Sequence, residues 1–308
     1  MANLKAIRKR ISSVKSTQKI TRAQKMVAGA RLTRAQHRIQ ALRPFAVKTA
    51  QVLADVVGQG AGADEEAVAS ENEHPLLARR AEKTVLLLVI TSDRGLCGAF
   101  NTNILRAATR IWQEREAAGQ SVKIVTIGRK GRDYFRRRNA PVLEVLSGIW
   151  EKLDIEQARS VARKVLTPFV QGEVDSVYVV YNEFKSAMSQ KVVAEPLIPL
   201  QQTAAAPAAA AEGAHGQDEA SKPEFLFEPN RKALLDSLVP IYIEISILRA
   251  LFESQASELG SRMTAMESAT KKAAEMIGKY TLIYNRARQA AITTELMEII
   301  GGAEALRS

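Results

Sequence analysis

The sequence predicts an α/β fold combined with a long coiled coil, in which the two ends of the chain pair as helices and the middle forms a sheet domain. Three observations lead to this prediction. Apolar residues recur at intervals of three and four near both ends of the chain. Between the ends, short apolar runs alternate with amphipathic stretches, as in a sheet covered by helices. Aromatic residues make up only 5% of the 308 residues, as expected when much of a chain is coiled coil.

The C-terminal stretch from about Asn230 to Leu306 carries the longest apolar seam. Large residues fill the seam near its start, whereas Ala, Thr and Tyr fill it near its end, so the far end of the helix should be slim. At about 1.5 Å per residue, roughly 75 helical residues extend for about 110 Å, which predicts that the helix projects from any globular domain. The seam consists of Ile245, Leu248, Phe252, Ala256, Leu259, Met263, Met266, Thr270, Ala273, Ile277, Tyr280, Tyr284, Ala287, Ala291 and Thr294.

The N-terminal residues offer a partner for this seam. Apolar residues recur at intervals of three and four over residues 4–57. Three polar residues, Gln18, Thr21 and Lys25, interrupt this pattern. Pro44 also falls inside it and predicts a kink, because proline lacks a backbone donor. Two long helices at opposite ends of one chain, with a compact segment between them, pair most simply as an antiparallel two-helix coiled coil.

The middle of the chain predicts a Rossmann-like, mainly parallel α/β domain. Its first strand, KTVLLLVIT, is apolar at consecutive positions, which is typical of a strand buried on both faces. Pro196 and Pro199 place the last strand at an edge of the sheet. Strands are expected at 83–91, 121–128, 142–146, 176–181 and 191–200, and helices at 102–117, 129–138 and 155–170.

Changes in composition mark the boundaries between these parts. Glycines and acidic residues follow the N-terminal helix, and an Ala- and Pro-rich stretch, TAAAPAAAAEGAHGQ, follows the last strand. The sequence therefore predicts an N-terminal coiled-coil helix (1–57), a linker (58–81), the central α/β domain (82–200), a low-complexity insertion (201–222), and a short extended segment followed by the C-terminal coiled-coil helix (223–308).

The positive charge of the chain is concentrated at its N-terminus. Residues 1–54 contain thirteen Lys and Arg and no acidic residue, the first being Asp55. Removing these thirteen from the 44 basic residues leaves 31 against 33 acidic ones, so the rest of the chain is close to neutral. Such a helix fits either a nucleic-acid-binding arm or a basic rod that lies against acidic protein surfaces.

No complete active site is evident. The loop TSDRGLCGAFN at 91–101 follows the first strand and opens a helix, where α/β sheets often bind phosphates. It matches neither glycine-rich phosphate motif, so we expect a tight turn. A catalytic role for Cys97 would need a nearby base, but His37, His74 and His215 all fall outside the α/β domain. No cluster has metal-ligand spacing, so we expect no catalytic, cofactor or metal site.

Three polar residues near the C-terminus, Arg288, Gln289 and Glu295, lie off the apolar seam and should face outward. Exposed polar residues on a helix are often only solvated. Periodicity alone therefore leaves a binding surface and a solvated surface equally open.

Four separated motifs closely resemble the gamma subunit of rotary, F-type ATP synthases of the bacterial type. They are IRKRISSVKSTQKITRAQKMVAGARL, TSDRGLCGAFN, FLFEPNRKALLDSL and YNRARQAAITTELMEIIGGAEAL. The resemblance covers nearly the whole chain apart from residues 58–81 and 201–222. Ile292, Thr293, Glu295, Glu298, Gly302 and Ala303 occupy the marked positions of the family's C-terminal signature.

The resemblance implies a central rotor shaft that transmits torque between a membrane ring of c subunits and a catalytic hexamer of three alpha and three beta subunits. Proton or sodium flow would drive its rotation. The coiled coil would stand inside the hexamer, and the α/β domain would join the epsilon subunit and the c ring. The subunit would be non-catalytic, would bind no nucleic acid, and would lie at the cytoplasmic face of the bacterial inner (plasma) membrane as a peripheral protein, associated through the complex only.

The resemblance also assigns contact residues. Arg288 and Gln289 fall where the tip of the shaft hydrogen-bonds to a beta-subunit loop, and Glu295 is expected in the same contact. A second set falls where the foot meets polar loops of the c ring, with Phe in place of the tyrosines often found there. This second set is Phe225, Phe227 and Glu228.

The alternative is a coiled-coil adaptor or nucleic-acid-binding protein that uses the basic N-terminal helix. It predicts DNA binding with a steep salt dependence. It gives no reason for the particular sequences of the tip and of the 91–101 loop.

Overall fold

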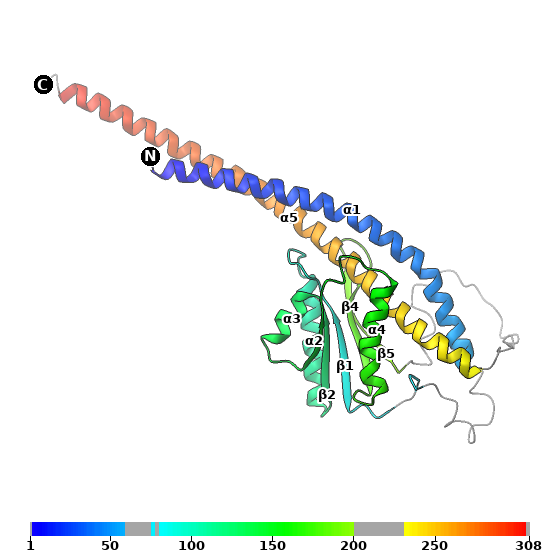
Figure 1. Ribbon diagram of the computed structural model, residues 1–308. Coiled ribbons are helices and arrows are strands. Elements are labelled where there is room, and N and C mark those ends of the chain that lie inside the picture. The colour runs from blue at the N-terminus through cyan, green and yellow to red at the C-terminus, as the bar shows by residue number, and fades with distance from the viewer. Residues whose placement is uncertain (1, 59–74, 78–79, 200–230, 306–308) are drawn as a thin grey trace, which may run out of the picture. The chain divides into compact units, whose positions relative to one another are not determined.

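A computed structural model of the protein describes residues 2–58, 75–77, 80–199 and 231–305 (Figure 1). The chain divides into two compact units, Met1–Ala30 with Arg262–Ser308, and Arg31–Ser261, and the two longest helices contribute to both. The elements are α1 (Ala2–Gly58), β1 (Thr84–Ile90), α2 (Phe100–Ala117), β2 (Ser121–Ile127), α3 (Arg129–Arg136), β3 (Val142–Leu146), α4 (Ile155–Val170), β4 (Ser176–Phe184), β5 (Gln190–Ile198) and α5 (Arg231–Ala305).

The Arg31–Ser261 unit contains a five-stranded sheet with the order β3-β2-β1-β4-β5. The first four strands are parallel, and β5 is antiparallel to β4. The predicted mainly parallel sheet and the edge position of the last strand are therefore confirmed. Strand β4 runs past its predicted end to Phe184, because its last residues pair with the start of β5, with Glu183 opposite Lys191.

Strand β1 is the centre of this sheet, and both of its faces are buried. Val85, Leu87 and Val89 point into the core beneath α2 and α3. The intervening residues, Leu86 and Leu88, point into the opposite core, toward α4 and α5. Successive strand residues alternate between the two faces, so an uninterrupted apolar run serves both cores at once.

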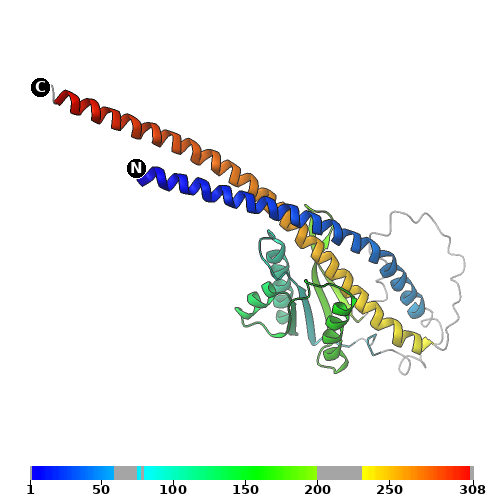
Figure 2. The ribbon, with the colours of Figure 1, turned by 45° about the horizontal axis from the view of Figure 1, so that its top comes forward.

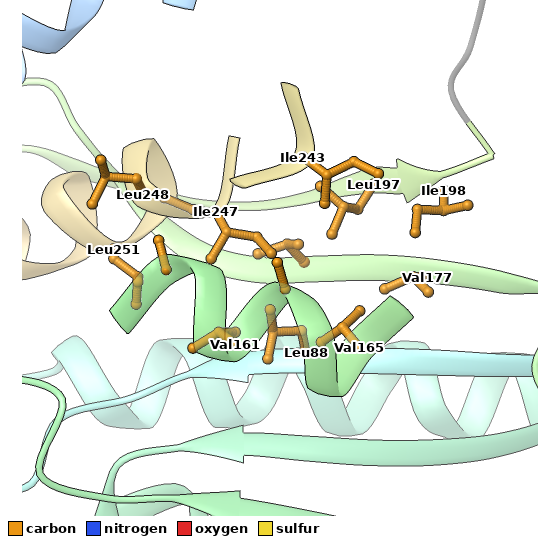
Figure 3. Close-up of a cluster of buried hydrophobic side chains, with 14 of the residues drawn as sticks. Leu88, Val161, Val165, Val177, Leu197, Ile198, Ile243, Ile247, Leu248 and Leu251 are labelled. Carbon is orange, nitrogen blue, oxygen red and sulfur yellow. The ribbon is translucent and has the colours of Figure 1, made fainter. Parts of the chain in front are cut away.

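The core on the α4 side is the larger of the two and holds the first part of α5. Asp154 caps the start of helix α4: its carboxylate accepts a hydrogen bond from the backbone N–H of Gln157. Fully burying one aliphatic side chain contributes about 1.5–3 kcal/mol, so this core fixes α5 firmly on the sheet. Figure 3 labels ten of its residues: Leu88, Val161, Val165, Val177, Leu197, Ile198, Ile243, Ile247, Leu248 and Leu251.

Helix α1 continues without a break through Pro44 to Gly58. A proline removes only one backbone hydrogen bond of the ladder, and the helix is continuous on both sides of Pro44. Leu53 and Val56 of this last part of α1 belong to the same core as α4 and α5. In the described ranges, no helix is long and apolar enough to cross a bilayer.

Candidate functional site: the coiled-coil tip and the helix anchor

In the unit formed by Met1–Ala30 and Arg262–Ser308, α1 and α5 lie side by side and run in opposite directions (Figure 1, Figure 2). The predicted seam is confirmed along most of this unit. On α1, Ile7, Thr21 and Ala28 are buried. On α5, Met266 and Ala273 are buried, and the later seam positions stay less exposed than their neighbours; these are Ile277, Tyr280, Tyr284, Ala287 and Ala291.

A polar layer crosses the middle of this coiled coil. The hydroxyl groups of Thr21 and Thr270 share a hydrogen bond of 2.8 Å. The sequence showed the interruption on α1 but not its partner on α5. Polar groups inside a coiled coil fix the axial alignment of the two helices, so this pair specifies their register.

An ion pair lies one turn away from the polar layer. Lys25 Nζ is 3.2 Å from Glu267 Oε1, and Lys271 lies 3.7 Å from the same oxygen. The hydrogen bond from Lys25, together with the two positive charges, lowers the pKa of the Glu267 carboxyl. The pair is solvent-exposed, so it contributes more to register than to stability.

Beyond this paired region α5 continues alone. In the register set by Thr21 and Thr270, the start of α1 lies level with about residue 289 of α5. Thr294, which the sequence placed on the seam, is therefore exposed, because no residue of α1 reaches it. The last four turns of α5 form a single exposed helix, here called the tip (residues 290–303).

The predicted contact residues lie at and next to this tip. Arg288, Gln289 and Glu295 are all exposed, as expected. Arg288 and Glu295 are seven residues apart, so they share one face of the helix at an axial distance of about 10 Å. Gln289 is rotated by about 100° from Arg288 and faces a different direction. The three side chains therefore lie within about 120° of one another around the helix axis, on one side of the helix.

Large apolar side chains are exposed on the tip as well. They fall within about 160° of one another around the helix axis, so they form one apolar side at the spacing of an apolar stripe. An exposed apolar side of this kind is typical of a surface that another protein covers. The residues are Ile292 (55% exposed), Leu296 (55%), Met297 (63%), Ile299 (70%) and Ile300 (53%).

The basic residues of α1 in this unit cover its outer surface. Seven of them are exposed, and Lys25 is half-buried against Glu267. No acidic residue of α1 neutralises them, since the first one, Asp55, belongs to the other unit. The seven are Lys5, Arg8, Lys9, Arg10, Lys15, Lys19 and Arg22.

In the Arg31–Ser261 unit, small residues of α5 allow a close contact with the hairpin that joins β4 and β5. Ser257 Oγ donates to the backbone oxygen of Asn182 at 3.1 Å, and Ser261 Oγ donates to Gln190 Oε1 at 2.9 Å. Gly260 lies directly against Ala187. The sequence analysis missed this anchor, although its signal, small residues at a spacing of three on a helix, is visible at 254, 257 and 260.

Polar groups of the loop between β1 and α2 hydrogen-bond to one another and to Asn101 of α2. The backbone N–H of Ser92 donates to Asn101 Oδ1 at 3.0 Å, and Asn101 Nδ2 donates to Cys97 Sγ at 3.1 Å. Gly98 has a φ of 55°, a left-handed conformation that favours glycine. The expected tight turn is confirmed, and Cys97 is buried within it.

Of the histidines and the expected c-ring contacts, only His37 lies in the part of the chain that the structure describes. His37 is exposed on α1. His74 and His215 lie outside the described residues, as do the expected c-ring contacts Phe225, Phe227 and Glu228. Within residues 2–58, 75–77, 80–199 and 231–305, no group of three His, Cys, Asp or Glu side chains could hold a metal ion.

The sequence is similar to one family along almost its whole length. A sequence model of the ATP-synt family, described as ATP synthase, matches residues 3–306. An ATP synthase gamma chain from Sorangium cellulosum is 57% identical, and the match covers 100% of both chains. A gamma chain from a Geobacter species is 46% identical, again over 100% of both chains.

Solved structures show the same fold. A chain in the central stalk and c-ring structure of the Tetrahymena thermophila mitochondrial ATP synthase is 27% identical, with a TM-score of 0.60; the match covers 81% of this chain and 99% of that one. A chain in a Euglena gracilis mitochondrial ATP synthase structure has a TM-score of 0.66 and covers 99% of this chain and 95% of the other. At 20% identity the latter supports the fold alone.

Proposed function

This chain belongs to the gamma-chain family of ATP synthase, and from that premise we propose that it is the central rotor shaft of an ion-driven ATP synthase. Its task is to transmit torque between the membrane c ring and the catalytic hexamer of alpha and beta subunits. The proposal rests mainly on one observation: helix α5 contributes to both compact units. Its residues 231–261 belong to the unit that contains the sheet, and the rest of the same helix forms the coiled coil and the tip.

Torque requires that α5 cannot turn about its own axis within the sheet unit. Ile243, Ile247 and Leu251 are fully buried against the sheet and α4 (Figure 3). An ion pair and a hydrogen bond add to this hydrophobic packing. Arg249 Nη2 lies 2.7 Å from Glu195 Oε2, and Ser257 Oγ donates a hydrogen bond to the backbone of β4. Rotating α5 would break both kinds of contact together, so a force on the sheet is passed to the helix.

The tip is suited to a bearing formed by other subunits. Apolar side chains on one side of the helix can be covered by surrounding subunits, and they make the shaft asymmetric, so each subunit meets a different surface as the shaft turns. Arg288, Gln289 and Glu295 add polar groups that can form hydrogen bonds with a beta-subunit loop at particular angles of rotation. The acid-free surface of α1 is complementary to acidic beta-subunit surfaces.

The foot of the shaft makes the remaining contacts in this proposal. Phe225, Phe227 and Glu228 meet polar loops of the c ring, and the epsilon subunit joins the sheet unit. The chain hydrolyses no ATP itself and serves a complex that does. It is held at the cytoplasmic face of the bacterial inner membrane by the complex, as a peripheral subunit.

The test is reconstitution. The purified chain is mixed with alpha and beta subunits of a related ATP synthase, and complex formation and ATP hydrolysis are measured with and without it. The proposal expects a complex containing one copy of this chain per hexamer, turnover that depends on the chain, and no hydrolysis by the chain alone. Failure to form the complex at low and moderate salt, together with salt-sensitive DNA binding, would support a nucleic-acid-binding protein instead.

A further inference from the structure

Two charged side chains of α5 lie within its contact with the sheet. Arg249 donates to Glu195 of β5 at 2.7 Å and to the hydroxyl of Tyr181 of β4 at 3.4 Å. Glu253 follows one turn later, on the same face of the helix. The sequence pattern shows both as polar positions beside the seam, but in the fold they face β4 and β5.

The hydrogen bonding around Glu253 is incomplete. Glu253 Oε2, Arg249 Nε and Ser254 Oγ are buried, and each lacks a hydrogen-bond partner in the described part of the chain. Buried polar atoms without partners are rare in folded proteins, and an ionised carboxylate suffers most from such a position. A proton on Glu253 removes its negative charge and so removes most of that penalty.

Burial and the neighbouring charges together raise the pKa of Glu253 to about 7. Burial is the largest effect and raises the pKa, Arg249 is the next largest and lowers it, Glu183 and Glu195 raise it, and Arg43 lowers it. Arg249 is only partly available to compensate, because it already bonds to Glu195. The groups that face Glu253 are Arg249 on α5, Arg43 on α1, Tyr181 and Glu183 on β4, and Glu195 on β5.

The contact beyond Glu253 is the part best able to open. Between Ser257 and Ser261, α5 holds the β4–β5 hairpin by hydrogen bonds and by the close approach of Gly260, and residues 185, 186, 188 and 189 of the hairpin are exposed. The earlier part of α5, around Ile243 and Ile247, is in the main core. Local opening begins where few apolar contacts hold an element, so the hairpin can loosen while the core stays folded.

We propose that Glu253 is a proton-binding site that controls how firmly the β4–β5 hairpin is held on α5. With a proton on Glu253 the contact is closed; without it, repulsion from Glu183 and Glu195 loosens the hairpin. This is a property of the folded chain itself and goes beyond the shaft role.

The direction of the pH dependence follows from the raised pKa of Glu253. Glu253 binds its proton more tightly in the closed contact than in the open one, in which the carboxyl has its ordinary pKa of 4.5. The stabilising effect is therefore complete below about pH 4.5, and it is lost as the pH rises through about 7.

Hydrogen–deuterium exchange of the full chain tests the proposal. Amide protection factors, corrected for the intrinsic effect of pH, are compared at pH 5.5 and pH 8.5. Those in residues 183–191 and 254–261 should fall by roughly 30-fold with rising pH, which is the change in the opening equilibrium expected for a carboxyl that titrates at about 7 when closed and at 4.5 when open. Amides of β1 should change far less, because they belong to the closed core.

Two variants identify the responsible group. Glu253→Gln keeps the size of the side chain and removes its titration, so the fall in protection should disappear and the hairpin should stay protected at pH 8.5. Glu244→Gln, on the same helix and paired with Arg159, is the matched control and should keep the wild-type response. An unchanged pH response in Glu253→Gln, or the absence of any response in the wild-type hairpin, overturns the proposal.

Discussion

Gly260 of α5 and Ala187 of the β4–β5 hairpin are in such close contact that a Cβ atom added to Gly260 would lie 3.1 Å from the Cα of Ala187 and 3.2 Å from its carbonyl oxygen. Few side-chain contacts in proteins are as close, and the neighbour here is backbone, which moves only together with the hairpin. The absence of a side chain at residue 260 is therefore a condition for the anchor between helix and sheet.

The first prediction concerns this glycine. Gly260→Val should lower the free energy of unfolding by about 1–3 kcal/mol, because overpacking forces the hairpin away from α5. Gly278→Val on the same helix is the control: apart from its chain neighbours and the nearby backbone of its own helix, no heavy atom of the described structure lies within 4 Å of the added Cβ, so its stability should stay within about 0.5 kcal/mol of wild type. Urea unfolding of the two variants measures the difference, and equal effects would show that the close contact is unimportant.

The second prediction concerns the polar layer of the coiled coil. Thr21 and Thr270 also bond to carbonyl groups of their own helices, at Gln18 and Met266. A double-mutant cycle of Thr21→Val and Thr270→Val should therefore give a modest coupling energy of about 0.5–1.5 kcal/mol. The double variant, which replaces both hydroxyls by methyl groups, should be at least as stable as wild type.

Thermal unfolding of all four proteins measures this coupling energy. A coupling energy indistinguishable from zero would mean that the two threonines do not interact across the coiled coil in solution.

The third prediction concerns pH. Lys25 lowers the pKa of Glu267 by a hydrogen bond and by its charge, and Lys271 adds to the effect. Since an acid with a lowered pKa stabilises the fold above its ordinary pKa, this contribution is present near neutral pH and is lost as the pH falls below about 4.5. In Lys25→Gln the pKa of Glu267 should move upward toward its ordinary value.

NMR titration of the Glu267 side-chain carboxyl measures that shift directly. Lys272→Gln serves as the control, because Lys272 pairs with Glu275 rather than with Glu267. A Glu267 titration unaffected by Lys25→Gln would show that the ion pair does not persist in solution.

The fourth prediction concerns the tip. A charge-assisted hydrogen bond contributes about 1.5–3 kcal/mol, so Arg288→Ala should weaken binding to the catalytic hexamer by roughly 10- to 150-fold, or lower coupled ATP synthesis. Stability of the isolated chain should not change, because Arg288 is exposed. Arg286→Ala is the matched control, since Arg286 is also exposed but lies about 200° around the helix.

Each variant is titrated into preformed hexamers of alpha and beta subunits to measure binding. ATP synthesis is then assayed in membranes to measure the coupling of rotation to synthesis. Wild-type behaviour of Arg288→Ala in both assays would show that this contact is dispensable.

Local patterns predicted most elements of the fold. Strand β3 and helix α4 have the predicted ends, 142–146 and 155–170. The apolar run of β1 predicted a strand buried on both faces, and β1 lies at the centre of the sheet. The seam positions of the coiled coil were correct up to Ala291, since a period of three and four residues directly records which face is buried.

Contacts between distant residues could not be predicted in this way. Arg249 and Glu253 are polar residues of a long helix, and the burial of Arg249 Nε and Glu253 Oε2 depends on tertiary packing that no local pattern records. Thr21 and Thr270 are 249 residues apart in sequence, and their pairing depends on the register of the two helices, which neither helix specifies alone. The contacts of Arg288, Gln289 and Glu295 depend on other subunits and remain predictions.

The most direct test of the shaft role is to observe rotation. A bead is attached through Met188→Cys, at an exposed position of the β4–β5 hairpin (86% exposed), in a Cys97→Ser background, and the hexamer of alpha and beta subunits is fixed to a surface. On addition of ATP the bead should turn in one direction, with pauses about 120° apart that reflect the threefold arrangement of the catalytic subunits. ATP hydrolysis by a complex that contains the chain, with the bead stationary or moving without direction, would contradict the account.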